Sequence, residues 1–225
     1  MIRALIFDFD GTLSNRQENA YEVFNFYLRK FYPDLTEIEF EALLQDMMMY
    51  DCNGSIPVKM RMGPFMNKYG KDLPEDFLDV FIPFYYDHMF EFCDLKKVTR
   101  EVLEKLQGRY KMAILSNGDS KSQHSKISKV DIEKYFDEVI VSGDIGIHKP
   151  DKRIFEYVAD KLSVKVEECL MIGDVFSSDI LGAYYANMPC VWMKTDPEKH
   201  ADYYKGYTIS DLRELFEILD EVNKQ

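Results

Sequence analysis

The sequence has little positive charge and no long hydrophobic run. Its 225 residues include 28 Lys and Arg against 40 Asp and Glu, which gives a formal net charge of -12. This balance disfavours duplex nucleic acid as a partner, because phosphate neutralisation requires clustered Lys and Arg. No apolar stretch is long enough to span a bilayer, and Asp8 and Asp10 interrupt the apolar N-terminal segment. Neither a membrane helix nor a signal peptide is therefore expected.

Cysteine is also scarce, with four residues and no C-x-x-C pair. We expect these cysteines to be free thiols in a reducing, cytoplasmic compartment. Hydrophobic residues make up 46% of the chain, which is enough for a packed core. The acidic charge does not exclude small anionic substrates, since a bound metal and a few local cations outweigh distant surface charge.

Short apolar runs alternate with amphipathic segments along the chain. This alternation predicts an α/β fold with a parallel sheet covered by helices on both faces. Strands are expected at residues 4–9, 112–116, 138–142, 169–173 and 190–193, and helices at residues 100–106, 153–162 and 179–187.

Residues 16–92 form a helical stretch that is too long for a simple crossover between two strands. Thr36 and Glu39 have the spacing of a capping box that opens one of its helices. We interpret residues 16–92 as an inserted, all-helical cap domain, with residues 1–15 and 93–225 forming the catalytic core.

Two aspartates follow the first apolar strand. Because strand side chains alternate between faces, Asp8 and Asp10 leave the strand end in the same direction. Burying both carboxylates is costly unless a cation or a shared proton compensates. Gly11 then permits a sharp turn. The pattern indicates a metal-dependent site with Asp8 as nucleophile and Asp10 as acid/base, whereas a lone D-x-D would favour an ordinary turn.

Two further strand ends and a loop carry polar groups. Ser116-Asn117-Gly118 offers a hydroxyl and main-chain N–H groups for a phosphoryl group, although it is also a good turn sequence. Lys149 is restricted by Pro150 and suits a phosphate, the alternative being a solvated lysine. Asp174 is placed to bind Mg²⁺ opposite Asp8. Asp179 either holds a metal-bound water or caps its helix.

These residues occur in the order and contexts of the haloacid dehalogenase superfamily, which the chain resembles over essentially its whole core. The resemblance implies a Rossmann-like core, Mg²⁺ and an aspartyl-phosphate intermediate. It also implies that the main-chain carbonyl of Asp10, rather than its carboxylate, binds the metal. The expected catalytic residues are Asp8, Asp10, Ser116 and Lys149, the expected metal ligands are Asp8, Asp10, Asp174 and Asp179, and the expected substrate-binding residues are Gly11, Thr12, Asn117, Gly118 and Arg16.

A narrower resemblance is to the pyrimidine 5′-nucleotidase branch. It rests on Asn53–Ile56, on Ile147–Pro150 with Arg153–Phe155, and on Gly173–Gly182. The chain departs from that branch at Pro64, where an arginine is expected, and at 47–49, which lack a tryptophan. The departures concern the substrate and leave the core motifs intact.

The leading hypothesis is a Mg²⁺-dependent phosphomonoesterase that acts on a small phosphorylated metabolite, such as a nucleoside 5′-monophosphate, as a monomer or homodimer. The alternatives are a sugar phosphomutase of the β-phosphoglucomutase kind and a phosphoglycolate-type phosphatase. A haloacid dehalogenase is disfavoured by Asp10, which is typically replaced in those enzymes. A non-catalytic binding protein would carry degenerate motifs, and the motifs here are intact.

Overall fold

A computed structural model describes residues 1–54, 56–195 and 203–224. The chain divides into two compact units, one made of Met1–Ser14 with Leu95–Gln225 and the other of Asn15–Asp94. Ser55, which belongs to the segment that resembles the nucleotidases, lies outside the described residues.

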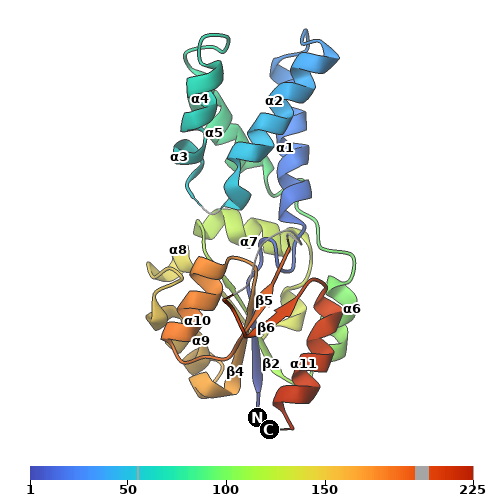
Figure 1. The fold of residues 1–225 in the computed structure, drawn as a ribbon, viewed down its shortest axis with the longest axis vertical. Helices are drawn as coiled ribbons and strands as arrows, with labels where there is room; N and C mark the ends of the chain where they lie inside the picture. The colour runs from blue at the N-terminus through green and yellow to red at the C-terminus, as the bar shows by residue number, and fades with distance from the viewer. Residues whose placement is uncertain (55, 196–202, 225) are drawn as a thin grey trace. The chain divides into compact units, whose positions relative to one another are not determined.

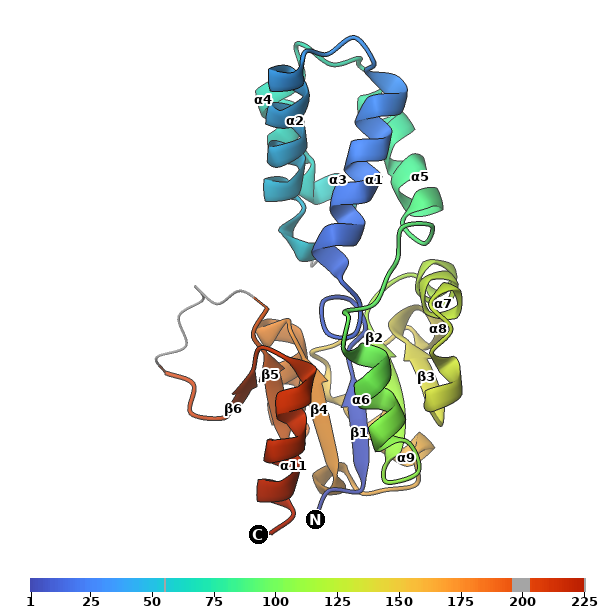
Figure 2. The same cartoon turned by 90° about the vertical axis from the view of Figure 1, so that its right-hand side faces the viewer.

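The first unit is built on a six-stranded sheet in the order β3-β2-β1-β4-β5-β6 (Figures 1 and 2). Every pair of neighbouring strands is parallel. The strands are β1 (Ala4–Phe7), β2 (Lys111–Ser116), β3 (Glu138–Val141), β4 (Cys169–Gly173), β5 (Cys190–Met193) and β6 (Tyr207–Ile209). The predicted α/β fold with a parallel sheet is thereby confirmed.

Helices cover both faces of this sheet. Figures 1 and 2 show α6 and α11 on one face, and α9 and α10 on the other. On the second face, Phe155 and Val158 pack against Ile6 and Leu115 of the sheet. The helices of this unit are α6 (Thr99–Leu106), α7 (Ser120–Lys129), α8 (Ser142–Ile145), α9 (Lys152–Lys161), α10 (Leu181–Tyr185) and α11 (Leu215–Val222), with 3-10 turns at Glu133–Tyr135, Val166–Glu168 and Leu212–Glu214.

The strand order reverses beside β1. The chain passes from β1 to β2 and β3 on one side, and then crosses to β4, β5 and β6 on the other. In open α/β sheets, ligands bind at the carboxyl ends of the strands where the order reverses. A ligand site is therefore expected at the residues that follow β1, β2 and β4.

The second unit is entirely helical, with a core of buried aromatic rings that includes Phe24, Tyr27 and Phe81. Its elements are α1 (Arg16–Phe31), α2 (Glu37–Tyr50), a 3-10 turn (Cys52–Gly54), α3 (Val58–Arg61), α4 (Gly63–Tyr69) and α5 (Phe77–His88). The predicted capping box is present, because the Thr36 hydroxyl accepts from the Glu39 N–H and the Glu39 carboxylate accepts from the Thr36 N–H.

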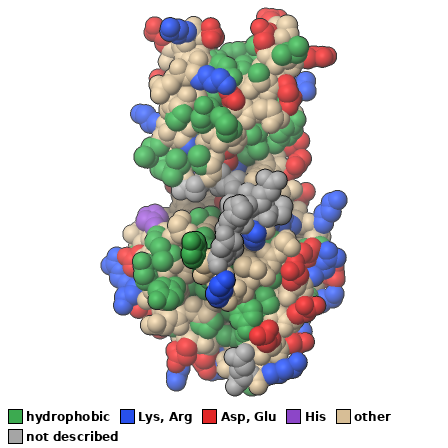
Figure 3. All heavy atoms as spheres, viewed as in Figure 1, with side chains coloured by type: hydrophobic (Ala, Val, Ile, Leu, Met, Phe, Trp, Pro, Cys, Tyr) green, Lys and Arg blue, Asp and Glu red, His purple; other side chains and the backbone are tan. Residues whose placement is uncertain are grey.

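The surface view in Figure 3 shows acidic and basic side chains interspersed on one face of the molecule. In the part of the chain that the structure describes, no helix is both long and apolar enough to cross a membrane.

Candidate active site

The ends of β1 and β4 bring Asp8 and Asp174 to the same edge of the sheet. The main-chain N–H of Asp8 donates to the Ile172 carbonyl oxygen of β4 at 2.9 Å. Gly11 has a φ of 87°, and a Cβ atom there would lie 2.3 Å from Asp174 Oδ2. Only glycine fits this close approach. Gly11 therefore serves as a turn packed against Asp174.

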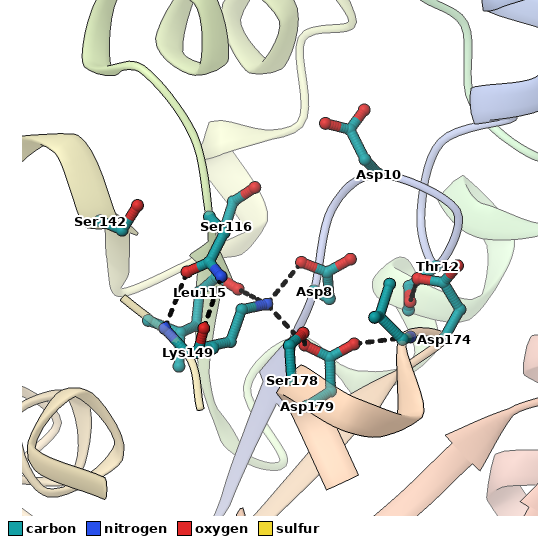
Figure 4. Close-up of polar contacts among 12 residues, drawn as sticks. Asp8, Asp10, Thr12, Leu115, Ser116, Ser142, Lys149, Asp174, Ser178 and Asp179 are labelled. Atoms are coloured by element: carbon teal, nitrogen blue, oxygen red, sulfur yellow. Dashed lines mark hydrogen bonds and ion pairs between the residues drawn. The ribbon is translucent and has the colours of Figure 1, made fainter. Parts of the chain in front are cut away.

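Lys149 lies at the centre of the site (Figure 4). Its Nζ atom is 2.7 Å from Asp8 Oδ1, 2.8 Å from Asp179 Oδ1 and 2.7 Å from the Leu115 carbonyl oxygen. An ammonium group has three hydrogens, and these acceptors engage all three. Lys149 therefore orients Asp8 by direct contact and places a positive charge among the buried carboxylates.

Asp179 is held by the backbone around it. It lies in a π-helical turn, Phe176–Ile180, a geometry that often occurs at functional sites. Its Oδ2 accepts from the Val175 N–H at 2.9 Å, and its Oδ1 accepts from the Ser178 hydroxyl at 3.1 Å. The carboxylate thus holds the backbone at the start of the turn and also pairs with Lys149. Asp179 is not a helix cap, because the N-cap residue of this turn is Val175 and no side chain forms a capping hydrogen bond there.

The buried carboxylates form a cluster that fits a divalent cation. Asp8, Asp174 and Asp179 each offer an oxygen, and these atoms lie within 4.8 Å of one another. The Thr12 hydroxyl donates to Asp174 Oδ1 at 3.3 Å. Three carboxylates and the Lys149 ammonium leave two negative charges, which a divalent cation would neutralise. Hard oxygen ligands are those that Mg²⁺ prefers.

The pKa values of the cluster reflect this excess of negative charge. Burial raises the pKa of Asp8 well above its usual range; the Lys149 ammonium opposes the shift, and the Asp179 and Asp174 carboxylates add to it. Burial, together with Asp179, raises the pKa of Asp174 to about 7, although Lys96 and Lys149 lower it. Burial lowers the pKa of Lys149, but the Asp179 and Asp8 carboxylates outweigh burial and raise it above its ordinary value.

The raised pKa of Asp174 predicts that the metal-free protein loses stability as the pH rises. The folded state binds this proton more tightly than the unfolded chain, in which the pKa is near 3.8. The contribution is therefore fully present below the unfolded pKa and is lost as the pH rises through about 7. Asp174→Asn should raise the free energy of unfolding in chelator at about pH 8 by about 1–4 kcal/mol, and should weaken stabilisation by Mg²⁺.

Urea denaturation at about pH 5 and about pH 8, with chelator and with Mg²⁺, checks this expectation. Asp34→Asn, at an exposed carboxylate of the helical unit, is the matched control. The same pH dependence in Asp174→Asn and in the wild type would contradict a buried proton on Asp174.

The segment after β2 contacts the loops that carry Lys149 and Ser142. The Asn117 side chain donates to the Lys149 carbonyl oxygen and accepts from the Lys149 N–H, both at 2.9 Å. Gly118 N–H donates to the Ser142 hydroxyl at 3.0 Å. The Asn117 side chain therefore positions the Lys149 segment. Ser116 Oγ accepts from Gln123 Nε2 at 2.7 Å, which leaves its own hydrogen to donate.

The Asp10 carboxylate points away from the Asp8 cluster (Figure 4). The prediction that Asp8 and Asp10 leave the strand in the same direction is therefore wrong, because β1 ends at Phe7 and Asp10 lies in the loop beyond it, where the alternation of a strand no longer applies. Its Oδ2 accepts from Gln123 Nε2 at 2.9 Å and pairs with the Lys126 ammonium, and its Oδ1 accepts from the Ser14 hydroxyl at 3.4 Å. The sequence pattern singled out neither Gln123 nor Lys126. The sequence offered one signal: these two polar residues are three positions apart on the helix that follows Ser116, which places both on the same side of that helix.

Arg16 belongs to the helical unit, where it forms a buried cluster with a second arginine. Arg16 Nη2 is 2.8 Å from the Tyr85 hydroxyl and 3.0 Å from Asp51 Oδ2. Arg61 pairs with the same carboxylate. Two guanidinium groups thus share one carboxylate, and within the described residues Arg16 Nη1 and Arg61 Nε are buried without a hydrogen-bond partner.

Comparison with known proteins identifies the family. The model of the haloacid dehalogenase-like hydrolases matches residues 5–193. The chain belongs to this family. The resemblance inferred from the motifs is thereby confirmed, and the protein is a hydrolase of the haloacid dehalogenase type.

Two curated relatives of this hydrolase are phosphatases. The chain is 32% identical over 143 residues to the glyceraldehyde 3-phosphate phosphatase of Pyrococcus furiosus, an alignment that covers 60% of each chain. It is 30% identical over 136 residues to the pyrimidine 5′-nucleotidase YjjG of Escherichia coli K12, which covers 58% of this chain and 59% of the relative. Each match thus spans somewhat less than two thirds of the relative.

A solved structure shares the fold across the whole length of this hydrolase. The HAD-hydrolase YfnB from Bacillus subtilis, in a crystal form bound to magnesium, has a TM-score of 0.77 and 24% sequence identity. The likeness covers 97% of this chain and 99% of the other.

Proposed function

We propose that this hydrolase is a Mg²⁺-dependent phosphomonoesterase that forms an aspartyl-phosphate on Asp8. The observation that carries the proposal is the buried cluster of Asp8, Asp174 and Asp179 around Lys149, which has two negative charges in excess when all three carboxyl groups are ionised. Mg²⁺, when bound, would offset these charges and those of a phosphoryl group. The phosphatase relatives and the magnesium-bound YfnB support the same proposal.

The proposed reaction has two displacement steps. An Asp8 carboxylate oxygen attacks phosphorus, the bond from phosphorus to the substrate oxygen breaks, and Asp10 gives a proton to the departing oxygen. A water molecule then attacks the aspartyl-phosphate, Asp10 takes a proton from that water, and inorganic phosphate leaves as the Asp8 carboxylate is restored. In both steps Lys149 keeps Asp8 oriented, and the Ser116 hydroxyl donates to a phosphoryl oxygen.

We propose that the substrate carries a polar or anionic group remote from its phosphate, as a nucleoside 5′-monophosphate does. The support is the cluster of Arg16, Arg61 and Asp51, in which two guanidinium groups face one carboxylate and, within the described residues, Arg16 Nη1 and Arg61 Nε have no hydrogen-bond partner. A buried guanidinium favours an acceptor for each of its N–H groups. Arg16 would then act in substrate recognition. The two relatives are named for different substrates.

We also propose a reducing, cytoplasmic setting. The support is that the four cysteines form no disulfide within the described residues. Burial raises the pKa of the Cys169 thiol to about 12, which keeps it protonated and unreactive.

Phosphate release from a panel of small phosphomonoesters, with Mg²⁺ and with chelator, tests the proposed function. The panel contains pyrimidine and purine nucleoside monophosphates, glyceraldehyde 3-phosphate, phosphoglycolate, hexose phosphates and p-nitrophenyl phosphate. We expect Mg²⁺-dependent release that is fastest with one natural ester. Arg16→Gln should then raise KM for that ester and leave KM for p-nitrophenyl phosphate unchanged. No release from any member would contradict the proposal.

A further inference from the structure

Two polar side chains of α7 are buried beside Asp10, and the two displacement steps assign neither of them a role. Gln123 is 3% exposed and Lys126 is 5% exposed. They are three residues apart, so they lie on the same side of the helix. Burying an ammonium group is costly without a partner of opposite charge. The Asp10 carboxylate is the partner that both side chains contact.

Gln123 connects three parts of the site through one nitrogen atom. Its Nε2 lies 2.9 Å from Asp10 Oδ2, 2.7 Å from Ser116 Oγ and 2.9 Å from the Asn117 carbonyl oxygen. Gly118 leaves room for this side chain, since a Cβ atom there would lie 2.8 Å from Gln123 Cγ. The amide thus fixes the separation between the Asp10 carboxylate and the Ser116 hydroxyl.

Lys126 adds charge to the same carboxylate oxygen. Its ammonium pairs with Asp10 Oδ2 and lies 5.8 Å from the centre of the Phe9 ring. The Lys126 side chain is 6% exposed, whereas that of Asp10 is 21% exposed. The buried Lys126 ammonium therefore fixes the position of the Asp10 carboxylate, which stays accessible to solvent.

The direction in which Asp10 is held suits its proposed chemistry. In an in-line displacement, the departing oxygen lies on the side of phosphorus opposite the attacking Asp8 oxygen. A group that protonates this oxygen must stand away from Asp8, and the Asp10 carboxylate does so (Figure 4). Proton transfer also requires the carboxylate to be within hydrogen-bond reach of the departing oxygen.

We propose that Gln123 and Lys126 are positioning residues that hold the Asp10 carboxylate at a fixed place relative to Ser116. They would thereby set the rate of proton transfer to the departing oxygen and from the attacking water. The inference rests on the proposed function, in which Asp10 is the acid/base. Neither side chain is assigned a contact with the substrate.

Gln123→Met and Lys126→Met test the proposal, because methionine keeps the length of each side chain and removes its donors. We expect kcat for an alkyl phosphate to fall about 10- to 100-fold, with KM within about twofold of the wild type. Lys126→Arg should recover most of the lost kcat. Lys121→Met, at an exposed lysine of the same helix, is the matched control and should behave as the wild type. Thermal melting shows whether each variant folds, and either methionine variant alone suffices for the test.

The decisive measurement repeats both substitutions in an Asp10→Asn background. If Gln123 and Lys126 act through Asp10, replacing either of them in this background should lower kcat by no more than about a further twofold. The same fall in both backgrounds would overturn the proposal, as would an unchanged kcat in the wild-type background. An Asp10→Asn variant with wild-type turnover would instead refute the acid/base role within the proposed function, so the two failures are distinguishable.

Discussion

Asp8→Asn is expected to abolish phosphate release, with a fall in kcat of at least about 10⁴-fold, and to leave the protein folded. The asparagine amide cannot act as the carboxylate nucleophile. The fold should tolerate the change, because Lys149 keeps its contacts with Asp179 and the Leu115 carbonyl oxygen. The neutral side chain also removes a carboxylate whose pKa burial raises well above its usual range. The variant should therefore unfold in chelator no more easily than the wild type.

Phosphate release at saturating substrate and Mg²⁺ measures the fall in kcat, and urea denaturation in chelator measures the stability of the variant. Asp160→Asn, at an exposed position of α9, is the matched control and should keep full activity. Acid quenching during turnover, followed by mass spectrometry, should find one phosphoryl group on the wild-type peptide that contains Asp8, and none on that peptide of the variant. An active Asp8→Asn variant would falsify the nucleophile assignment.

Most of the sheet could be predicted from sequence because its strands are short apolar runs between helical segments. The predicted strand at residues 169–173 matches β4, whereas β1 ends at Phe7, two residues before the expected end. The strand β6 (Tyr207–Ile209) was missed. It has only three residues, at the edge of the sheet, and the exposed Thr208 separates Tyr207 from Ile209, so the apolar run is too short to predict a strand.

The candidate site was likewise predicted only in part from the sequence. Asp8, Ser116 and Asp174 could be grouped from sequence, because parallel strands present their carboxyl ends at one edge. Gln123 and Lys126 could not, because α7 is rich in polar residues and reads as a solvated helix. Their burial depends on how α7 packs against the loop that carries Asp10. Tertiary packing decides that arrangement, and local sequence does not encode it.

Lys149→Met is expected to impair turnover and stability together. The substitution removes the ammonium that contacts Asp8 and Asp179, and leaves buried carboxylates without that counter-ion. Removing one partner of a buried ion pair costs about 3–5 kcal/mol of folding free energy. Turnover should fall by about 10²–10³-fold, since Asp8 loses its orientation and the phosphoryl group loses a nearby positive charge.

The stability defect of Lys149→Met should grow with pH. Lys149 lowers the pKa of both Asp8 and Asp174, so its loss raises these values further above those of the unfolded chain. Carboxyl groups with raised pKa values destabilise the fold as the pH rises through them, because the folded state holds the protons that the unfolded state releases. The variant should therefore be least stable, relative to the wild type, at about pH 8 in chelator.

Urea denaturation at about pH 5 and about pH 8 measures this dependence, and Lys152→Met, at an exposed lysine at the start of α9, is the matched control. Added Mg²⁺ should restore part of the lost stability, because a divalent cation offsets the same carboxylates. A Lys149→Met variant as stable as the control at the higher pH would contradict the counter-ion role. The two readouts separate the contributions of Lys149, because a lysine that only attracted the phosphoryl group would change turnover and leave the pH dependence of unfolding unchanged.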